Sequence, residues 1–256
     1  MIVIDIGNTE TVIGLYLKKK LIKIDRIISS ISINNFEKKF NKYFQLHKKL
    51  LSNNENKLCV ISSVVPKLTK IILKNVKKES FKFFKVKGDS AYNKFKINYD
   101  LNQIGADRIA NSVAVIESKI SDSIVIDFGT ATTFEVVKNR VFVGGLIFPG
   151  INLSKESLVK KASLLKDAKI IKTQKIIANN TINSIQSGFY WGYIFAINGI
   201  IKKIIKEQKF KPKIVLTGGL ANIYKNQIQP KAIVKQNLTL EGLRIIGDRV
   251  NVKKIK

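Results

Sequence analysis

Two segments of the chain place an acid, a glycine and hydroxyl side chains directly after a run of apolar residues. They are IVIDIGNT at 2–9 and IVIDFGTATT at 124–133, with acids Asp5 and Asp127. A glycine after a buried strand lets the backbone approach an anion closely. Hydroxyl and backbone N–H groups can then bind phosphate, and the carboxylate can hold a cation. Two such phosphate loops in one chain predict two halves that face one nucleotide.

A third acid, Asp107, lies in the segment Gly105-Ala106-Asp107-Arg108, at the start of a predicted helix that runs to Ser118. An acid in a first helical turn is favoured by the helix dipole. The same acid could also act as a general base beside an arginine that binds an anion. The sequence leaves both interpretations open and does not place Asp107 relative to either loop.

A glycine pair, Gly218-Gly219, also follows a predicted strand and precedes a helix. Such a turn could lie against a nucleotide base or ribose, and the helix N-terminus favours phosphate. Glycine pairs also occur in turns for structural reasons alone, so this segment predicts a nucleotide contact less firmly than the two loops do.

The elements that must position these residues follow the same order in both halves. In the first half we expect strands at 2–6, 11–17, 21–28, 58–65 and 81–86, and helices at 34–51 and 66–78. In the second half we expect strands at 124–128, 132–138, 141–147 and 213–217, and helices at 152–165, 180–206 and from Leu238, with Thr239 as N-cap. A meander followed by alternating helices and strands, seen twice, predicts duplicated α/β domains with a cleft between them and a boundary near 115–122.

The single cysteine and the single histidine limit the kinds of catalytic and metal site that the chain can form. The single cysteine, Cys59, excludes an intramolecular disulfide and a Cys-rich metal site, and we expect it to be buried in a strand. We expect the single histidine, His47, in a lysine-rich stretch, to lie on the surface, while Phe36, Phe40, Tyr43 and Phe44 have helical spacing and form core. We therefore propose no histidine-based catalysis and no histidine metal site.

The longest apolar stretch, 182–205, is interrupted by polar and charged residues and predicts a packed helix, not a membrane span. Its Gly188 and Gly192 indicate close contact with another helix. The N-terminus lacks the features of a signal peptide, which favours a cytoplasmic location.

The formal net charge of +28 admits two interpretations. One is a nucleic-acid binder, and the other is a lysine-rich solvated surface. The lysines are spread along the whole chain and aromatic residues are not interleaved with them as a stacking surface requires. We therefore expect no specific nucleic-acid partner, although salt-sensitive non-specific binding is expected.

Taken together, the motifs resemble those of the type III pantothenate kinase family. The segments that carry the resemblance are DIGNTE at 5–10, GADRIAN at 105–111, IDFGTATTF at 126–134, GGLIFPG at 144–150, NTINSIQSG at 180–188, LTGGLA at 216–221 and LTLEGL at 238–243. They run in family order over nearly the whole chain. The resemblance implies an actin-like ATPase fold of the acetate and sugar kinase/Hsp70/actin superfamily, with ribonuclease H-like domains at 1–117 and 118–256.

The resemblance also implies a reaction, the ATP-dependent phosphorylation of pantothenate in the first step of coenzyme A synthesis. Asp107 would be the catalytic base, and Asp5 would help to place Mg²⁺. Asp127 would bind a monovalent cation, K⁺ or NH₄⁺. The residues that would contact ATP are Asp5, Ile6, Gly7, Asn8, Thr9, Glu10, Thr11, Val12 and Thr130. Those that would contact pantothenate are Tyr99, Gly105, Ala106, Asp107, Arg108 and Thr181. The family is typically a homodimer whose pantothenate site is completed at the subunit interface.

The chain departs from the family pattern in three loops. It lacks the proline that the family often has between Tyr99 and Gly105, has Leu164-Leu165 where the family often has Leu-Pro, and lacks the glycine often found before Asn180-Thr181. These changes alter loop rigidity and not the chemical groups. Two alternatives remain open: a kinase of the same superfamily for another small hydroxyl substrate, and a regulatory or nucleic-acid-binding protein that keeps the fold without the activity.

Overall fold

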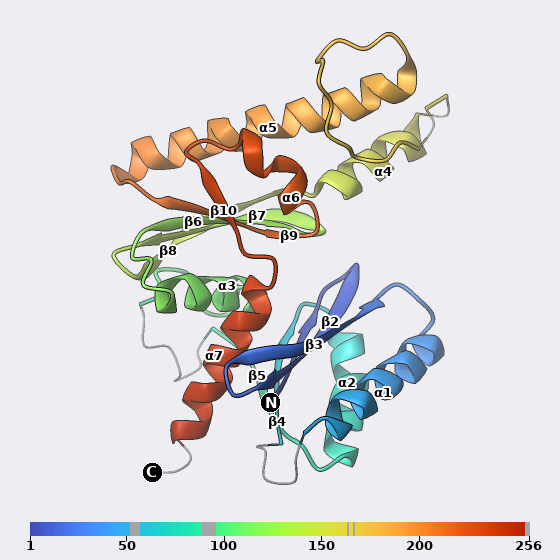
Figure 1. Cartoon of the computed structure of the whole chain (residues 1–256), viewed down its shortest axis with the longest axis vertical. Coiled ribbons are helices and arrows are strands. Elements are labelled where there is room, and N and C mark those ends of the chain that lie inside the picture. Colours follow the sequence, from blue (N-terminus) through green and yellow to red (C-terminus); the bar gives the residue numbers. More distant parts are fainter. Residues whose placement is uncertain (52–56, 89–95, 163, 166, 254–256) are drawn as a thin grey trace. The chain divides into compact units, whose positions relative to one another are not determined.

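The computed structural model describes residues 1–51, 57–88, 96–162, 164–165 and 167–253. The chain forms two compact units (Figure 1). Unit 1 comprises Met1–Ser118 together with the C-terminal helix, and unit 2 comprises Lys119–Asn237. From the sequence, we expected residues 118–256 to form the second domain. The C-terminal helix instead packs with unit 1, because its apolar side chains lie against the first sheet.

Unit 1 contains one five-stranded sheet of order β3-β2-β1-β4-β5. Its strands are β1 (Ile2–Ile6), β2 (Glu10–Leu17), β3 (Lys20–Ile28), β4 (Leu58–Ser63) and β5 (Lys82–Lys85). Its helices are α1 (Ile33–Lys49), α2 (Pro66–Lys78), α3 (Ala106–Glu117) and α7 (Leu238–Lys253). β2 is antiparallel to β1 and β3, whereas β4 is parallel to β1 and β5. The predicted elements of this half are confirmed to within a few residues.

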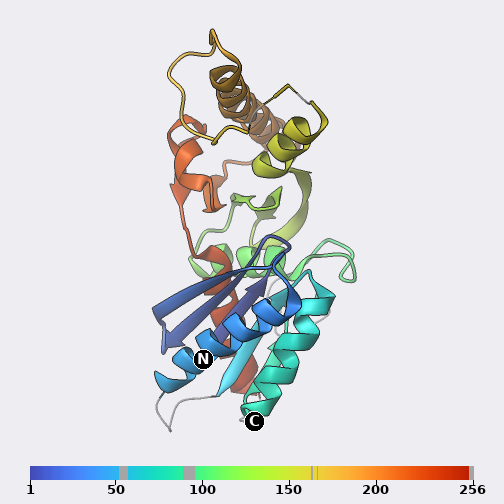
Figure 2. The ribbon, with the colours of Figure 1, turned by 90° about the vertical axis from the view of Figure 1, so that its right-hand side faces the viewer.

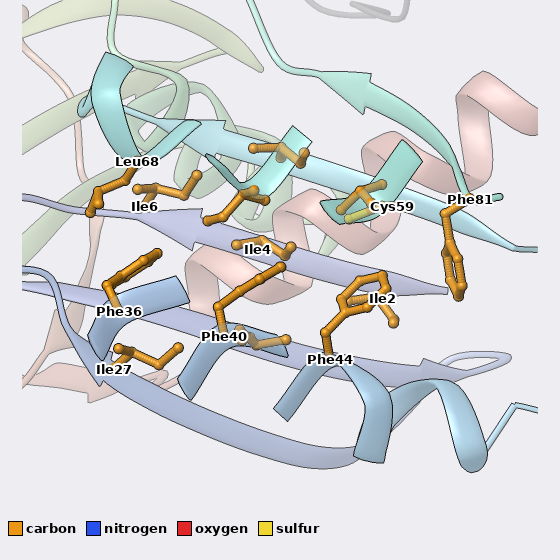
Figure 3. Close-up of a cluster of buried hydrophobic side chains, with 14 of the residues drawn as sticks. Ile2, Ile4, Ile6, Ile27, Phe36, Phe40, Phe44, Cys59, Leu68 and Phe81 are labelled. Atoms are coloured by element: carbon orange, nitrogen blue, oxygen red, sulfur yellow. The ribbon is translucent and has the colours of Figure 1, made fainter. Parts of the chain in front are cut away.

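Helices α1 and α2 cover one face of this sheet and lie side by side in Figure 2. Phe36, Phe40 and Phe44 of α1, at four-residue spacing, point onto the isoleucines of β1 (Figure 3). Each of these phenylalanines is at most 1% exposed. The predicted core role of this aromatic stripe is therefore confirmed, as is the burial of Cys59 in β4.

The other face of the first sheet is covered by α3 and α7. α7 contacts β1 and β4, and α3 and α7 pack against each other. The backbones approach closely at Gly242, where an added Cβ atom would lie 1.9 Å from the Ala110 carbonyl oxygen. Glycine is therefore required there for α7 to rest on α3. This packing fixes the start of α3, which carries Asp107.

Unit 2 repeats the sheet of unit 1. Its strands are β6 (Ser123–Phe128), β7 (Ala131–Lys138), β8 (Val141–Pro149), β9 (Lys213–Gly218) and β10 (Ala232–Val234), in the order β10-β9-β6-β7-β8. Its helices are α4 (Ile151–Lys161), α5 (Thr181–Gln208) and α6 (Ala221–Tyr224), followed by a 3₁₀ turn at Lys225–Gln227. α5 and α6 bury aromatic side chains, including Tyr190 and Tyr224, against one face of this sheet.

The two sheets also share irregularities in strand register and backbone conformation. The β2/β3 register shifts between Leu15 and Tyr16, and the β7/β8 register shifts at the equivalent position, between Val136 and Val137. The residue after the second strand is left-handed in both units, with φ of 53° at Lys18 and 50° at Asn139. The two halves therefore share the geometry of the hairpin formed by their second and third strands.

Three local predictions were wrong. The helix expected at 152–165 ends at Lys161. The short strand β10 was not predicted, since three residues carry too little periodicity. Thr239 does not cap α7; its hydroxyl donates a 2.9 Å hydrogen bond to Asn111 Oδ1 and so ties α7 to α3.

The expected surface position of His47 was also wrong. Its side chain is fully buried in unit 1, and its Nε2 lies 2.7 Å from Asp25 Oδ2. Burial lowers the pKa of His47 below its ordinary value of 6.5, and the Asp25 carboxylate opposes part of that shift. The surface position was expected because the neighbouring residues are lysines. In the last turn of α1, however, His47 faces the interior.

We expect the stability of the protein to fall as the pH drops below 6.5. The unfolded chain then binds a proton at His47 that the folded chain resists, so the free energy of unfolding decreases towards acid. Urea unfolding between pH 7.5 and 5 tests this, because most carboxylates titrate below that window. The variant His47→Gln should show a shallower dependence. Equal slopes in the two proteins would contradict the assignment.

Candidate active site

The first phosphate loop is a tight turn that joins β1 to β2. The Gly7 N–H donates to the Glu10 carbonyl at 3.0 Å, and the Ser29 N–H donates to the Thr9 carbonyl at 2.9 Å. Asn8 and Thr9 are exposed at its tip. The loop is therefore anchored on two strands while its polar tip stays open to a ligand.

The predicted ATP segment divides into contacting and supporting positions. The Ile6 and Thr11 side chains are fully buried, and the Thr11 hydroxyl lies 3.0 Å from the Ser29 hydroxyl. These two side chains support the loop from beneath. Ligand contacts from the segment would therefore come from the backbone and from Asp5, Asn8 and Thr9, whereas the Glu10 carboxylate is paired with Arg26.

Asp5 stands near the carboxyl end of β1 between two neighbouring strands. Its register partners are Val12 on β2 and Ser62 on β4. Ser62 is fully buried, and its hydroxyl has no hydrogen-bond partner among the described residues. Sequence reasoning missed Ser62, although hydroxyl residues at the end of a strand parallel to β1 were the available signal.

The second loop is one residue shorter. The Gly129 N–H donates to the Ala131 carbonyl at 3.1 Å, and Thr130 is exposed at the tip. Asp127 holds the position equivalent to Asp5, with Thr133 on β7 and Thr217 on β9 as register partners. A carboxylate thus lies in a row with hydroxyl residues, which is an oxygen-rich environment suited to a hard cation.

The glycine pair after β9 belongs to this second loop. Gly218 has a φ of +86°, and an added Cβ would lie 2.6 Å from both Asp127 Oδ1 and the Phe128 carbonyl oxygen. The backbone of Gly218 therefore forms one wall of the position that holds the Asp127 carboxylate. This contact explains the glycine without any nucleotide base.

Asp107 occupies the first turn of α3 in unit 1. Its Oδ1 is buried and has no hydrogen-bond partner within the described part of the chain. A buried polar atom without a partner costs free energy and is uncommon in folded proteins. Such an atom is expected where a ligand supplies the missing hydrogen bond, which favours the catalytic interpretation over a simple helix-dipole role.

Four of the predicted substrate residues accompany Asp107 in unit 1. The Arg108 guanidinium is 5.4 Å from the centroid of the Tyr99 ring, in cation–π geometry. Arg108 is 4% exposed and Tyr99 is 36% exposed. The ring therefore orients the arginine and presents one edge to solvent, while Gly105 and Ala106 form the turn that leads into α3.

Thr181 belongs to unit 2, where it is the first residue of α5. It lines a pocket of about 900 Å³ between α4, α5 and the segment that connects them. The apolar walls include Phe148, Phe189 and Tyr193, and the polar residues Asn179, Asn180, Thr181 and Ser184 form one side. Asn180 caps α5 by accepting a 2.9 Å hydrogen bond from the Asn183 N–H.

Gly188 and Gly192 line the same pocket. A Cβ added to either would meet no atom within 4 Å. The predicted close contact with another helix is therefore not made by the described residues of this chain. The two glycines leave an open strip on α5.

Acidic clusters are sparse in the described part of the chain. No group of three or more His, Cys, Asp or Glu residues could hold a metal ion there. This arrangement still fits Mg²⁺ in a nucleotide site, since that ion is usually held by one or two carboxylates together with substrate phosphates.

Comparison with known proteins decides among the sequence alternatives. The family model for type III pantothenate kinase matches residues 1–203. The chain belongs to the type III pantothenate kinase family. It is 40% identical to a type III pantothenate kinase of Pelagibacter ubique, over 95% of this chain and 96% of the relative. A type III pantothenate kinase of Geobacter sp. strain M21 is 37% identical over 97% and 99%.

Solved structures bear on the fold alone. The ethanolamine utilization protein EutJ from Carboxydothermus hydrogenoformans superposes with a TM-score of 0.57 at 12% identity, covering 96% of this chain and 89% of that one. Two mixed five-stranded sheets with helices match the actin-like ATPase fold, as the family resemblance implied. The position of the cleft between the two domains stays a prediction.

We expect Gly218→Ala to disturb the second loop of this type III pantothenate kinase family member. The left-handed φ costs about 1–3 kcal/mol for a residue with a side chain, and the new methyl group displaces Asp127. Chemical unfolding and ATP turnover would measure both effects. Gly219→Ala is the matched control, because a Cβ there meets nothing within 4 Å. Equal behaviour of the two variants would contradict the role of Gly218.

Proposed function

We propose that the protein catalyses ATP-dependent phosphorylation of pantothenate to 4′-phosphopantothenate, the first step of coenzyme A biosynthesis. The observation that carries the proposal is the buried Asp107 Oδ1, which has no hydrogen-bond partner among the described residues. It precedes Arg108, whose guanidinium lies over the Tyr99 ring. Membership of the family supplies the acceptor, because the relatives are named for pantothenate.

Asp107 acts as the general base in this proposal. The primary hydroxyl of pantothenate attacks the γ-phosphorus in line, the bond from that phosphorus to the β,γ-bridging oxygen breaks, and ADP leaves. Asp107 Oδ1 accepts the hydroxyl proton. Phosphoryl transfer depends on positioning and charge neutralisation more than on covalent chemistry. A correctly placed base contributes about 10²- to 10⁴-fold to the rate.

Residues of unit 1 would hold the phosphate end of ATP. The loop around Gly7, with the exposed Asn8 and Thr9, offers backbone N–H groups and polar side chains to the phosphates. Asp5 would hold Mg²⁺, which offsets phosphate charge when bound. Ser62 is buried next to Asp5 in the sheet, and its hydroxyl, which bonds to no described residue, would be available to the same ligand.

Two residues of unit 2 would bind a monovalent cation or the nucleotide. Asp127 would bind K⁺ or NH₄⁺ with support from the hydroxyl residues that flank it in the sheet. Thr130, exposed at the loop tip, would contact ATP. These assignments rest on the family resemblance together with the oxygen-rich row in which Asp127 lies.

The proposed pantothenate contacts include Tyr99 and Arg108 of unit 1 and Thr181 of unit 2. Arg108 carries a permanent charge that suits the carboxylate of pantothenate, and Tyr99 holds its guanidinium in place. Thr181 would add a hydroxyl from the rim of the unit 2 pocket.

A second copy of the chain would cover the open strip on α5, so we propose a homodimer. Gly188 and Gly192 leave room for close approach of a helix, and Phe195 on the same helix is 58% exposed. An exposed aromatic beside a glycine strip is typical of a surface that is buried in an assembly.

The proposed location is the cytoplasm, where ATP and pantothenate are available. None of the described helices is long and apolar enough to cross a membrane. We propose no specific nucleic-acid partner, since the lysines are spread over the entire sequence.

Release of ADP from ATP and Mg²⁺, with and without pantothenate, tests the reaction. We expect turnover to require pantothenate and to be faster in K⁺ than in Na⁺, and we expect Asp127→Ala to abolish the response to K⁺. ATP binding without pantothenate-dependent turnover would point to another acceptor or to a non-catalytic protein. A retained K⁺ response in Asp127→Ala would place the cation elsewhere.

We expect Asp107→Asn to lower kcat by about 10²- to 10⁴-fold while ATP affinity is kept, because the amide cannot accept the proton. Steady-state turnover and nucleotide titration measure the two quantities. Glu207→Gln is a suitable control, since it removes one exposed negative charge near the end of α5. Near-normal turnover of Asp107→Asn would remove this residue from the role of base.

A further inference from the structure

A row of side chains crosses the unit 1 sheet at the level of the first phosphate loop. Ser62 pairs with Asp5, Asp5 pairs with Val12, and Val12 pairs with Arg26 on β3. Paired residues point to the same face of a sheet. Ile27, next to Arg26, is buried in the cluster beneath α1 and α2, so Arg26 shares the opposite face with Asp5.

Arg26 is held beside the loop by an ion pair. Its Nη1 lies 2.5 Å from Glu10 Oε2, and the two side chains are 45% and 37% exposed. Glu10 also closes the loop through its carbonyl, which accepts the Gly7 N–H. Two strand spacings separate Arg26 from Asp5, about 10 Å. A guanidinium and a carboxylate thus stand on either side of the loop tip.

The duplicated unit lacks this charge. The equivalent row in unit 2 is Thr217, Asp127, Thr133 and Ile147. Ile147 takes the place of Arg26 and is 65% exposed, and Ala131 takes the place of Glu10. The hydroxyl and the carboxylate are therefore kept in both halves, whereas the arginine and its partner acid occur in the first half alone.

We propose that Arg26 binds the phosphate chain of ATP by exchanging Glu10 for phosphate oxygens. The inference rests on the proposed function, and it adds a residue of β3 to the nucleotide site. A guanidinium can donate two parallel hydrogen bonds to a phosphate. Glu10 is then a positioning residue, which keeps the flexible arginine beside the loop before ATP arrives.

The energetics favour such an exchange. An exposed ion pair contributes little to stability, typically about 0–1 kcal/mol, so its loss on ATP binding costs little. Phosphate carries more charge than a carboxylate and attracts the guanidinium more strongly.

Nucleotide titration of the intact protein tests the role of Arg26. We expect Arg26→Gln to weaken ATP binding by about 10- to 100-fold, the range expected for a charged hydrogen bond. AMP, which lacks the β- and γ-phosphates, should bind with less than threefold change. Lys20→Gln, at the other end of β3, is the matched control for the loss of one positive charge and should change ATP affinity by less than twofold.

Glu10→Gln tests the exchange itself. The variant should bind ATP at least as tightly as the parent protein, because the competing carboxylate is gone. A loss as large as that of Arg26→Gln would overturn the exchange, since the intact ion pair would then be needed.

Equal ATP affinities of Arg26→Gln and Lys20→Gln, with unchanged melting temperatures, would overturn the role of Arg26. An equal loss for AMP and ATP would also overturn it. These titrations use no pantothenate, so they remain decisive even if the parent protein binds ATP and fails to phosphorylate pantothenate.

Discussion

The structure depends on the position of one strand in each sheet. β1 and β6 lie at the centre, with an antiparallel hairpin partner on one side and a parallel strand on the other. Apolar residues fill each central strand up to a single acid, Asp5 or Asp127, near its carboxyl end. A carboxylate is costly to bury without partners, so it is placed where the sheet gives way to a polar turn. The phosphate loops follow from this placement.

The two halves have equivalent strand orders but differ in the residues around the acid of the central strand. Both keep a hydroxyl residue next to the acid, at Ser62 and Thr217. The first loop is longer and has the Glu10–Arg26 pair beside it, while the second is shorter and is walled by the Gly218 backbone. The duplicated scaffold thus carries a charged residue, Arg26, on the third strand of unit 1 and an apolar residue, Ile147, at the equivalent position of unit 2. Charge at the third strand, and not the strand order, distinguishes the two units.

Helix α3 of unit 1 carries both buried apolar residues and Asp107, the proposed catalytic base. Its apolar residues from Ile109 to Ile116 are buried, and Gly242 lets α7 rest directly on it. This packing can offset the cost of burying Asp107 Oδ1, which has no hydrogen-bond partner in the described part of the chain. Rigid support from α7 also reaches the site through the hydrogen bond between Thr239 and Asn111. In the proposed mechanism, the Asp107 Oδ1 that accepts the proton has no hydrogen-bond donor among the described residues.

The sequence by itself determined every strand except β10, the two loops, the aromatic stripe of α1 and the duplicated order, because these follow from local periodicity and turn chemistry. It also determined the family, through motifs that lie within short segments. Only the tertiary structure decided that α7 packs in unit 1, that His47 is buried against Asp25 and that Gly218 contacts Asp127. It alone placed Ser62 and Arg26 in one row with Asp5. Strand pairing joins residues that are far apart in the chain, and no local pattern in a single sequence records which strands will meet.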